Sequence, residues 1–347
     1  MIKMKNILLS LFLLLNISFA DILAPDISFL ELPLSGKSAS LGNTFLADIG
    51  NPTNLLLNPS NIWFGEDVNS SPRTFMKNTF HRFSLSNFKM MDDDSHVNFM
   101  YSLQYGNKIT LGLGYVENSR YNIDQYDNNA NYIGEIQYQE KALVTGFATQ
   151  IVGVNLGSSI GLINNNFYGY NISHQDDIYL LSVGLSMNNK YLKIKRDGFD
   201  KKIINYLTYL IPYRISVHLN SKNIFYNEIS NNSLYKNVIG LKFDYFFNRE
   251  GNNQIKKNLV YFLLDYSSNN DVTNNTFNFG IGYERFLNQI GSINFNMGVK
   301  KIQSFEGLSY GLEYKDKTTN LCISLANVVT AWNDDYIVLS FKYAYNK

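Results

Sequence analysis

A chain of 347 residues can form two soluble domains or one large β-fold, and its net charge of +1 argues against the concentrated basic surface that nucleic-acid binding needs. Aromatic residues make up 15% of the chain and there are only 6 prolines, which favours many long strands. Beyond residue 20, no uninterrupted apolar run reaches the ~20 residues that a membrane-spanning helix requires.

The first twenty residues have the pattern of an export signal. Lys3 and Lys5 precede an apolar stretch from Ile7 to Ile17, and Ser18-Phe19-Ala20 provides a small-x-small cleavage site. We predict cleavage after Ala20. A membrane anchor is the competing interpretation, but the apolar run is short and contains Asn16.

Residues 21–79 are predicted to form an N-terminal arm whose central part runs from Gly36 to Ile62. This segment begins with small residues, continues with the apolar pair Phe45-Leu46 and a turn at Gly50-Asn51-Pro52, and closes with Leu55-Leu56-Leu57-Asn58-Pro59. It has too many turn residues for a regular element and is too apolar for a linker. We therefore expect it to pack inside another structure.

The segment resembles the N-terminal signature of the PorV/PorQ family, a branch of the FadL-like outer-membrane barrels. The matching positions are Gly36, Lys37, Leu41, Gly42, Phe45, Ala47, Asn58, Pro59 and Ile62. Asn43 stands in place of the family's second glycine, and Gly50-Asn51 replaces an acidic pair. The resemblance implies that the segment forms a plug in the lumen of a barrel. The alternative is an N-terminal arm that caps a soluble β-domain.

From residue 80 to residue 347 the chain alternates apolar and polar residues in runs of about ten, which is typical of a transmembrane antiparallel β-barrel. We predict about fourteen strands, an even number as such barrels require. Their approximate ranges are 82–89, 96–105, 109–118, 138–150, 156–165, 177–187, 213–220, 235–247, 257–266, 276–287, 292–301, 307–315, 319–328 and 336–345. The inner face is predicted to be polar and rich in small residues.

Connections of alternating length support this assignment, because periplasmic turns are short and extracellular loops are longer. Tight turns are expected at residues 106–108, 153–155 and 288–291, and long Asn- and Tyr-rich outer loops at residues 117–137, 166–176 and 221–234. Residues 188–212 break the pattern. Their helical spacing predicts a short amphipathic helix, and an extra hairpin from Tyr191 to Lys195 is the alternative.

The sequence offers little support for catalysis, a cofactor or a metal. Its glycine pairs lack the third glycine of a dinucleotide site, its 4 histidines are scattered, and its single cysteine, Cys322, allows no disulfide framework. Ser216 and His218 would share one face of a strand, but no third group completes a triad.

Two functions follow from these patterns. The resemblance implies a secretion-associated barrel of the outer membrane that works with type IX secretion machinery and binds a protein partner, for which we expect the extracellular loops to be used. The alternative is a FadL-like channel for uptake of hydrophobic small molecules. Either barrel requires outer-membrane lipid and the barrel-assembly machinery, which reads an aromatic C-terminal strand such as Ile337 to Tyr345.

Overall fold

The computed structural model describes residues 32–44, 50–63, 79–89, 95–106, 109–126, 130–151, 153–169, 172–189, 212, 214–226, 233–247, 258–269, 276–287, 290–302, 305–330 and 335–346. The predicted signal peptide, the sites Phe45 and Ala47, and the predicted helix between residues 190 and 211 lie outside these ranges.

Nearly all of the described chain is β-strand. The strands are β1 (Thr79–Lys89), β2 (Ser95–Tyr105), β3 (Ile109–Tyr126), β4 (Tyr132–Ile151), β5 (Val154–Gly169), β6 (Ile172–Asn189), β7 (Arg214–Tyr226), β8 (Ser233–Phe247), β9 (Asn258–Asn269), β10 (Thr276–Leu287), β11 (Gly291–Ile302), β12 (Phe305–Asp316), β13 (Leu321–Thr330) and β14 (Tyr336–Asn346). The three helices are short: α2 (Gly36–Ser40), α3 (Asn54–Leu57) and η2 (Pro59–Ile62). None of the helices in the described part of the chain is long and apolar enough to cross a membrane.

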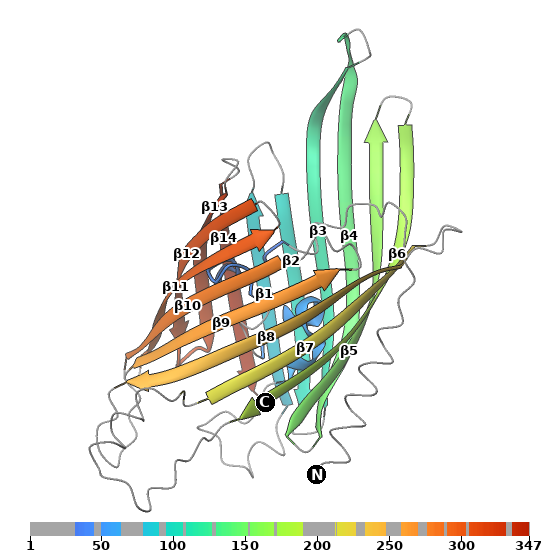
Figure 1. Ribbon diagram of the computed structural model, residues 1–347. Helices are drawn as coiled ribbons and strands as arrows, with labels where there is room; N and C mark the ends of the chain where they lie inside the picture. Colours follow the sequence, from blue (N-terminus) through green and yellow to red (C-terminus); the bar gives the residue numbers. More distant parts are fainter. Residues whose placement is uncertain are drawn as a thin grey trace, which may run out of the picture.

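The fourteen strands form one closed antiparallel barrel in which each strand pairs with its neighbours in the sequence (Figure 1). The first and last strands close the wall, from Phe80 opposite Asn346 to Lys89 opposite Ile337. This confirms the predicted fold class and strand number. Closure leaves no strand edge around the wall, so every backbone donor and acceptor there can be satisfied within the protein.

Side chains alternate across the wall as the sequence pattern predicts. On β11, Phe295 and Met297 are each 53% exposed on the outer surface, whereas Asn296 between them is 3% exposed and points inward. The outer face is dominated by large apolar and aromatic side chains, and most described inner-face positions are small or polar. This arrangement suits a barrel whose outer surface contacts lipid.

Three segments that we predicted to be outer loops are largely strand instead. Residues 117–126 and 132–137 extend β3 and β4, residues 166–169 and 172–176 extend β5 and β6, and residues 221–226 lengthen β7. The apolar alternation that marks lipid-facing strands stops near residue 117, and strand pairing continues beyond it. The Tyr and Ile residues in these stretches have high strand propensity, which does not depend on contact with lipid.

The depth of a side chain in the membrane can be tested on β11. We expect Met297→Arg, near the middle of the outer surface, to cost roughly 2 to 4 kcal/mol of folding free energy because it places a cation in hydrocarbon. Ile290 is 62% exposed at the turn before β11, so Ile290→Arg should cost only about 0 to 1 kcal/mol. Equal losses in folding experiments with lipid vesicles would contradict this placement.

Candidate functional site

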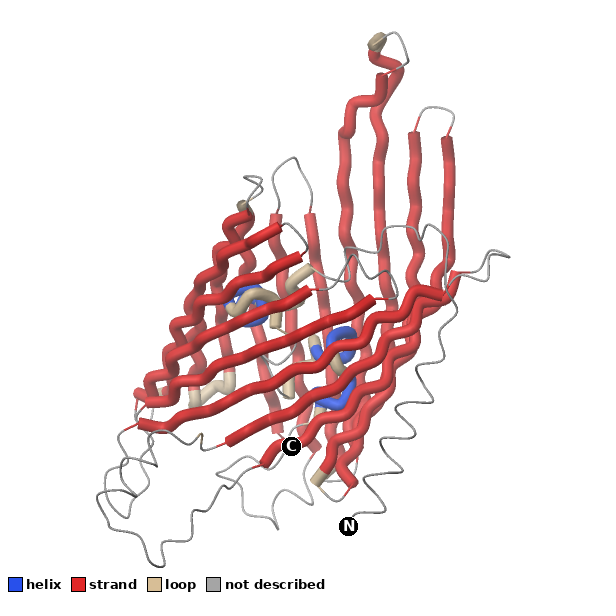
Figure 2. Tube along the Cα trace, in the orientation of Figure 1, coloured by secondary structure: helices blue, strands red, loops and turns tan. Residues whose placement is uncertain are grey.

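The first described part of the N-terminal segment lies inside the barrel, where α2 packs against β11, β12, β13 and β14 (Figure 2). Ser35 is the N-cap, and its side chain accepts a hydrogen bond from the Ser38 backbone N–H at 3.1 Å. The helix ends at once because Gly42 and Asn43 adopt positive φ angles of 70° and 57°. Local residues therefore limit α2 to a single turn of helix.

Glycines on the wall let α2 approach the strands at backbone distance. A β-carbon added at Gly280 would lie 2.8 Å from the Leu41 carbonyl oxygen, and one at Gly311 would lie 2.7 Å from the Ser40 Cβ. At Gly298 it would overlap the backbone of Leu41 and Gly42. These glycines of the inner face form the surface on which α2 rests, where the sequence predicted many small residues.

Backbone donors of the segment also bind serines of the wall. The Gly36 N–H donates to Ser340 Oγ, and the Gly42 N–H donates to Ser309 Oγ, each at 3.0 Å. Both bonds join residues more than 260 positions apart in the sequence. The first bond satisfies a donor at the N-terminus of α2 that intrahelical bonds cannot reach. The Gly42 N–H is shared between Ser309 and the Ala39 carbonyl oxygen, which lies 3.2 Å away.

The second described part of the segment packs on the opposite wall. Here η2 contacts β4, β5 and β6, and α3 contacts β3 and β4. The Asn58 side chain caps η2 by accepting a hydrogen bond from the Ser60 backbone N–H at 3.1 Å. A β-carbon at Gly157 would overlap Pro59 and Ser60, and one at Gly184 would overlap the Asn58 side chain. The Asn58-Pro59 motif therefore packs against the wall where Gly157 and Gly184 leave room for it.

The structure brings the predicted site residues together as two groups. Near β10–β14 lie Gly36, Lys37, Leu41 and Gly42, and near β4–β7 lie Asn58, Pro59 and Ile62. Leu41 is fully buried against Tyr261 and Leu263 of β9, and Ile62 is fully buried in the larger apolar cluster. The motif residues that are described are therefore contact residues between the segment and the wall.

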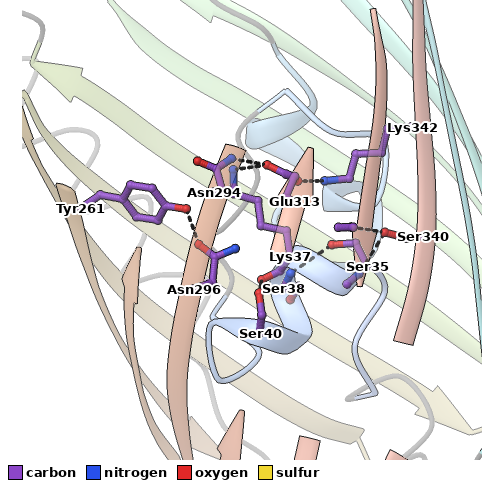
Figure 3. Close-up of polar contacts among 12 residues, drawn as sticks. Ser35, Lys37, Ser38, Ser40, Tyr261, Asn294, Asn296, Glu313, Ser340 and Lys342 are labelled. Atoms are coloured by element: carbon purple, nitrogen blue, oxygen red, sulfur yellow. Dashed lines mark hydrogen bonds and ion pairs between the residues drawn. The ribbon is translucent and has the colours of Figure 1, made fainter. Parts of the chain in front are cut away.

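A buried charged group holds Lys37 against the wall (Figure 3). Lys37 Nζ lies 2.9 Å from Glu313 Oε1, and Lys342 Nζ lies 3.3 Å from the other carboxylate oxygen. Asn294 Nδ2 also donates to Glu313 at 2.7 Å. Lys37 lies over the ring of Tyr261, 5.7 Å from its centroid. The Glu313 carboxylate thus joins three elements of the interior.

A second charged group lies on β7 and β8. Asp244 pairs with Arg214 at 3.3 Å and with Lys242 at 3.4 Å. Lys242 Nζ also lies over the Tyr261 ring, 4.9 Å from its centroid. Because Lys37 and Lys242 both approach Tyr261, this tyrosine connects the two charged groups. Its hydroxyl donates to Asn296 Oδ1 at 2.7 Å.

Ser216 and His218 share the inner face of β7 but have no described hydrogen bond to each other. Instead, His218 Nδ1 donates to Asn61 Oδ1 of the segment at 2.8 Å. This contact uses the imidazole as a structural donor between wall and segment. No group of three or more His, Cys, Asp or Glu side chains in the described residues could hold a metal ion.

The inner wall of β3–β8 is more apolar than we predicted. Its buried apolar side chains are Val116, Ala142, Val144, Ala148, Ile163, Ile178, Leu180, Ile224 and Val238. From the segment, Leu34, Leu55, Leu56, Leu57, Ile62 and Trp63 pack against them. The prediction of a mainly polar inner face therefore missed this apolar patch, which lies among polar and small residues of the same strands.

The sequence does indicate this apolar wall, but through continuous apolar runs and not through the alternation of apolar and polar residues. Residues 142–144 and 178–181 are apolar at every position, so both faces of β4 and β6 are apolar there. Continuous apolar runs are typical of strands buried on both sides. Assigning only every second residue to the outside concealed the apolar residues that point inward.

No protein-family model matches the sequence, and no curated protein matches it. Among solved structures, the chain is similar to the CymD monoaromatic hydrocarbon channel, with a TM-score of 0.55 and 10% identity over 90% of this chain and 97% of that one. It is also similar to a deltaS2S3 mutant of TodX, a monoaromatic hydrocarbon channel, with a TM-score of 0.53 and 10% identity over 91% and 99% of the two chains.

These likenesses define the class of protein by its fold. The chain is a closed fourteen-stranded antiparallel β-barrel that shares its fold with two monoaromatic hydrocarbon channels. The two neighbours are monoaromatic hydrocarbon channels, and at 10% identity the likeness shows a shared barrel fold.

The close approach of α2 to β11 can be tested with one methyl group. Gly298→Ala should displace α2, at a cost of about 1 to 3 kcal/mol, because the new Cβ would overlap the backbone of the segment. Trypsin should then cleave more rapidly after Lys37. Gly161→Ala is the matched control, since its nearest neighbours are Val144, Leu143 and Leu180, all on the wall. Equal protection of Lys37 in the two variants would contradict this docking mode.

The contacts of Glu313 predict which of two substitutions destabilises the protein more. Glu313→Gln leaves Lys37 and Lys342 facing a neutral amide, so we expect a loss of about 3 to 5 kcal/mol in the free energy of unfolding. Lys37→Met should cost less because Glu313 keeps its contact with Lys342. Denaturant titrations of both variants in the same detergent measure the difference, and a larger loss for Lys37→Met would refute the central role of Glu313.

Proposed function

We propose that this barrel is a channel through which hydrophobic small molecules cross the outer membrane. The observation that carries the proposal is the apolar inner wall of β3–β8. A channel for polar solutes needs a wetted inner wall, whereas a hydrophobic ligand needs apolar surface that removes it from water. The likeness to two monoaromatic hydrocarbon channels supports the same class of function.

The segment Gly36–Ile62 is proposed to act as a plug that covers this wall. Leu55, Leu56 and Ile62 are fully buried against it. Burying one such side chain contributes roughly 1.5 to 3 kcal/mol, so a ligand that displaces them must bury comparable apolar area. Hydrophobic molecules meet that requirement and small polar molecules do not. The chemistry of the covered wall thereby selects the ligand.

The polar half of the segment gives the proposed plug a fixed end. Around α2 the contacts are ionic and hydrogen-bonded, with Glu313, Ser309 and Ser340 as partners. A hydrophobic ligand cannot replace these contacts, because they require donors and acceptors. We therefore propose that the leucine-rich half, rather than α2, gives way to a ligand.

A second candidate function is a secretion-associated barrel of the PorV/PorQ type that binds a protein partner. Two observations favour it: the motif residues of the segment lie at the wall, and β3–β6 extend well past the other strands (Figure 1). The apolar inner wall favours the channel, because binding a protein outside the barrel does not require it. Export with cleavage after Ala20 and insertion by the barrel-assembly machinery are proposed for both.

The channel proposal is tested by transport of a hydrophobic probe. Vesicles containing the purified protein are mixed with the fluorescent hydrophobe 1-phenylnaphthylamine, and entry is compared with that of a polar dye of similar size. We expect entry of the hydrophobe only. Leu180→Asn places an amide on the apolar wall and should reduce entry about 5- to 150-fold, since an unpaired buried amide costs about 1 to 3 kcal/mol.

Leu111→Asn is the control for this experiment because Leu111 is 50% exposed on the outer face of β3. It should change hydrophobe entry much less than Leu180→Asn does. Deleting residues 32–63 should increase entry of both dyes while the barrel keeps its heat-modifiable mobility. Selective passage of the polar dye through the intact protein would overturn the channel proposal, and unchanged entry after the deletion would overturn the plug.

A further inference from the structure

Four neighbouring strands continue far beyond the lipid-facing part of the barrel. The strands β3–β6 contain 16 to 20 residues, whereas β9–β14 contain 10 to 12. The exposed aliphatic side chains of β3, β4 and β5 end near Leu113, Leu143 and Leu162, and the large exposed side chains beyond them are the tyrosines Tyr126, Tyr132 and Tyr168. From residue 117 to the end of β3, about ten residues add roughly 30 Å of strand. Figure 1 shows the two hairpins standing above the rest of the barrel.

We call this part the protruding sheet: residues 117–126, 132–141, 164–169 and 172–177. Its two outer strands, β3 and β6, pair there with no further strand among the described residues. The ladder between β2 and β3 ends at Ser95 opposite Ser119, and the ladder between β6 and β7 ends at Tyr226 opposite Ile178. A strand edge without a partner presents backbone donors and acceptors that can pair with another chain.

The two edges differ in regularity. On the β3 side, the pairing with β4 shifts between Arg120 and Ile123 and again between Gln125 and Tyr126. Such bulges twist an edge and disturb further pairing, which is how proteins protect exposed edges. On the β6 side, the ladder with β5 continues without a shift to Gly169 opposite Ile172. Residues 172–177 also contain no proline, lysine or arginine, so the charged residues of this edge are acidic only.

Charge indicates what kind of chain fits the β6 edge. Residues 164–177 include Asp176 and Asp177 but no lysine or arginine. The protruding sheet as a whole has more acidic than basic residues: Glu117, Asp124, Glu135, Glu140, Asp176 and Asp177 against Arg120 and Lys141. Two copies of this edge would repel each other, because like charges on adjacent strands are unfavourable. A basic strand would instead be attracted.

We propose that residues 172–177 of β6 accept a basic, extended segment of another protein as an added strand. Backbone hydrogen bonds to the regular edge supply the pairing, and the carboxylates of the protruding sheet select lysine- or arginine-rich segments. This binding site is separate from the apolar wall inside the barrel and does not depend on the channel function.

The proposal is tested with the full-length protein in lipid nanodiscs and a fluorescent peptide of alternating lysine and valine. We expect saturable binding that weakens as salt is added. A second peptide has the same residues and charge but methyl groups on alternate backbone amides along one edge. If a strand is added, methylation should weaken binding at least about tenfold, because it removes backbone donors and blocks close pairing.

Two variants with the same change in net charge locate the site. Asp176→Lys with Asp177→Lys should weaken peptide binding at least about tenfold, and Asp124→Lys with Glu135→Lys on the bulged hairpin should weaken it no more than about threefold. Heat-modifiable mobility confirms that both variants fold.

Three results would overturn the proposal. Equal binding of the methylated peptide would show attraction by charge without strand addition. Equal losses in the two double variants would remove the β6 edge as the site. Peptide-independent dimers that disappear in the Asp176→Lys, Asp177→Lys variant would identify a second copy of this chain as the occupant.

Discussion

The closed ladder of backbone hydrogen bonds is the constraint on which the rest of this structure depends. In hydrocarbon, an unpaired N–H or C=O costs several kcal/mol, so the wall must close before any other feature can exist. The pairing of β1 with β14 provides that closure. Once the wall is complete, its inner surface is shielded from lipid. Charged groups such as Glu313 with Lys37 and Lys342 can then be buried at positions that would be prohibitive on the outer face.

The inner segment is held in two chemically different ways, and the difference comes from the strands on each side. Around α2, the wall provides glycine, serine and a carboxylate, so the contacts are backbone approach, hydrogen bonds and an ion cluster. Around α3 and η2, the wall provides aliphatic side chains and only a few polar contacts, such as Asn220 Nδ2 to the Leu57 carbonyl oxygen at 2.7 Å. One short segment therefore combines a polar anchor with an apolar cover.

Alternation in the sequence was enough to predict the barrel, its fourteen strands and the outward face, because a period of two has one dominant physical cause in lipid. It was not enough for the interior. Where β4 and β6 are apolar on both faces, the inward residues are masked by their lipid-facing neighbours. Contacts such as Lys37 with Glu313 join residues 276 positions apart, and no local pattern encodes them. The outer ends of β3–β6 were predicted to be loops but are strands. Strands that pair in water need no lipid-facing side, so their sequences lack the apolar alternation on which the prediction relied.

The position of α2 has a consequence for the order of assembly. Its docking surface is built from β10 to β14, the last strands of the chain, and Gly36 bonds to a serine 304 residues away. The segment nearest the N-terminus is made first, yet its partners exist only after the final hairpins have joined the wall. Contacts between such distant residues form late, because the intervening chain must already be ordered. A docked α2 is therefore a marker that the last strands have joined the wall, and an intermediate that lacks those strands would have no place to hold it.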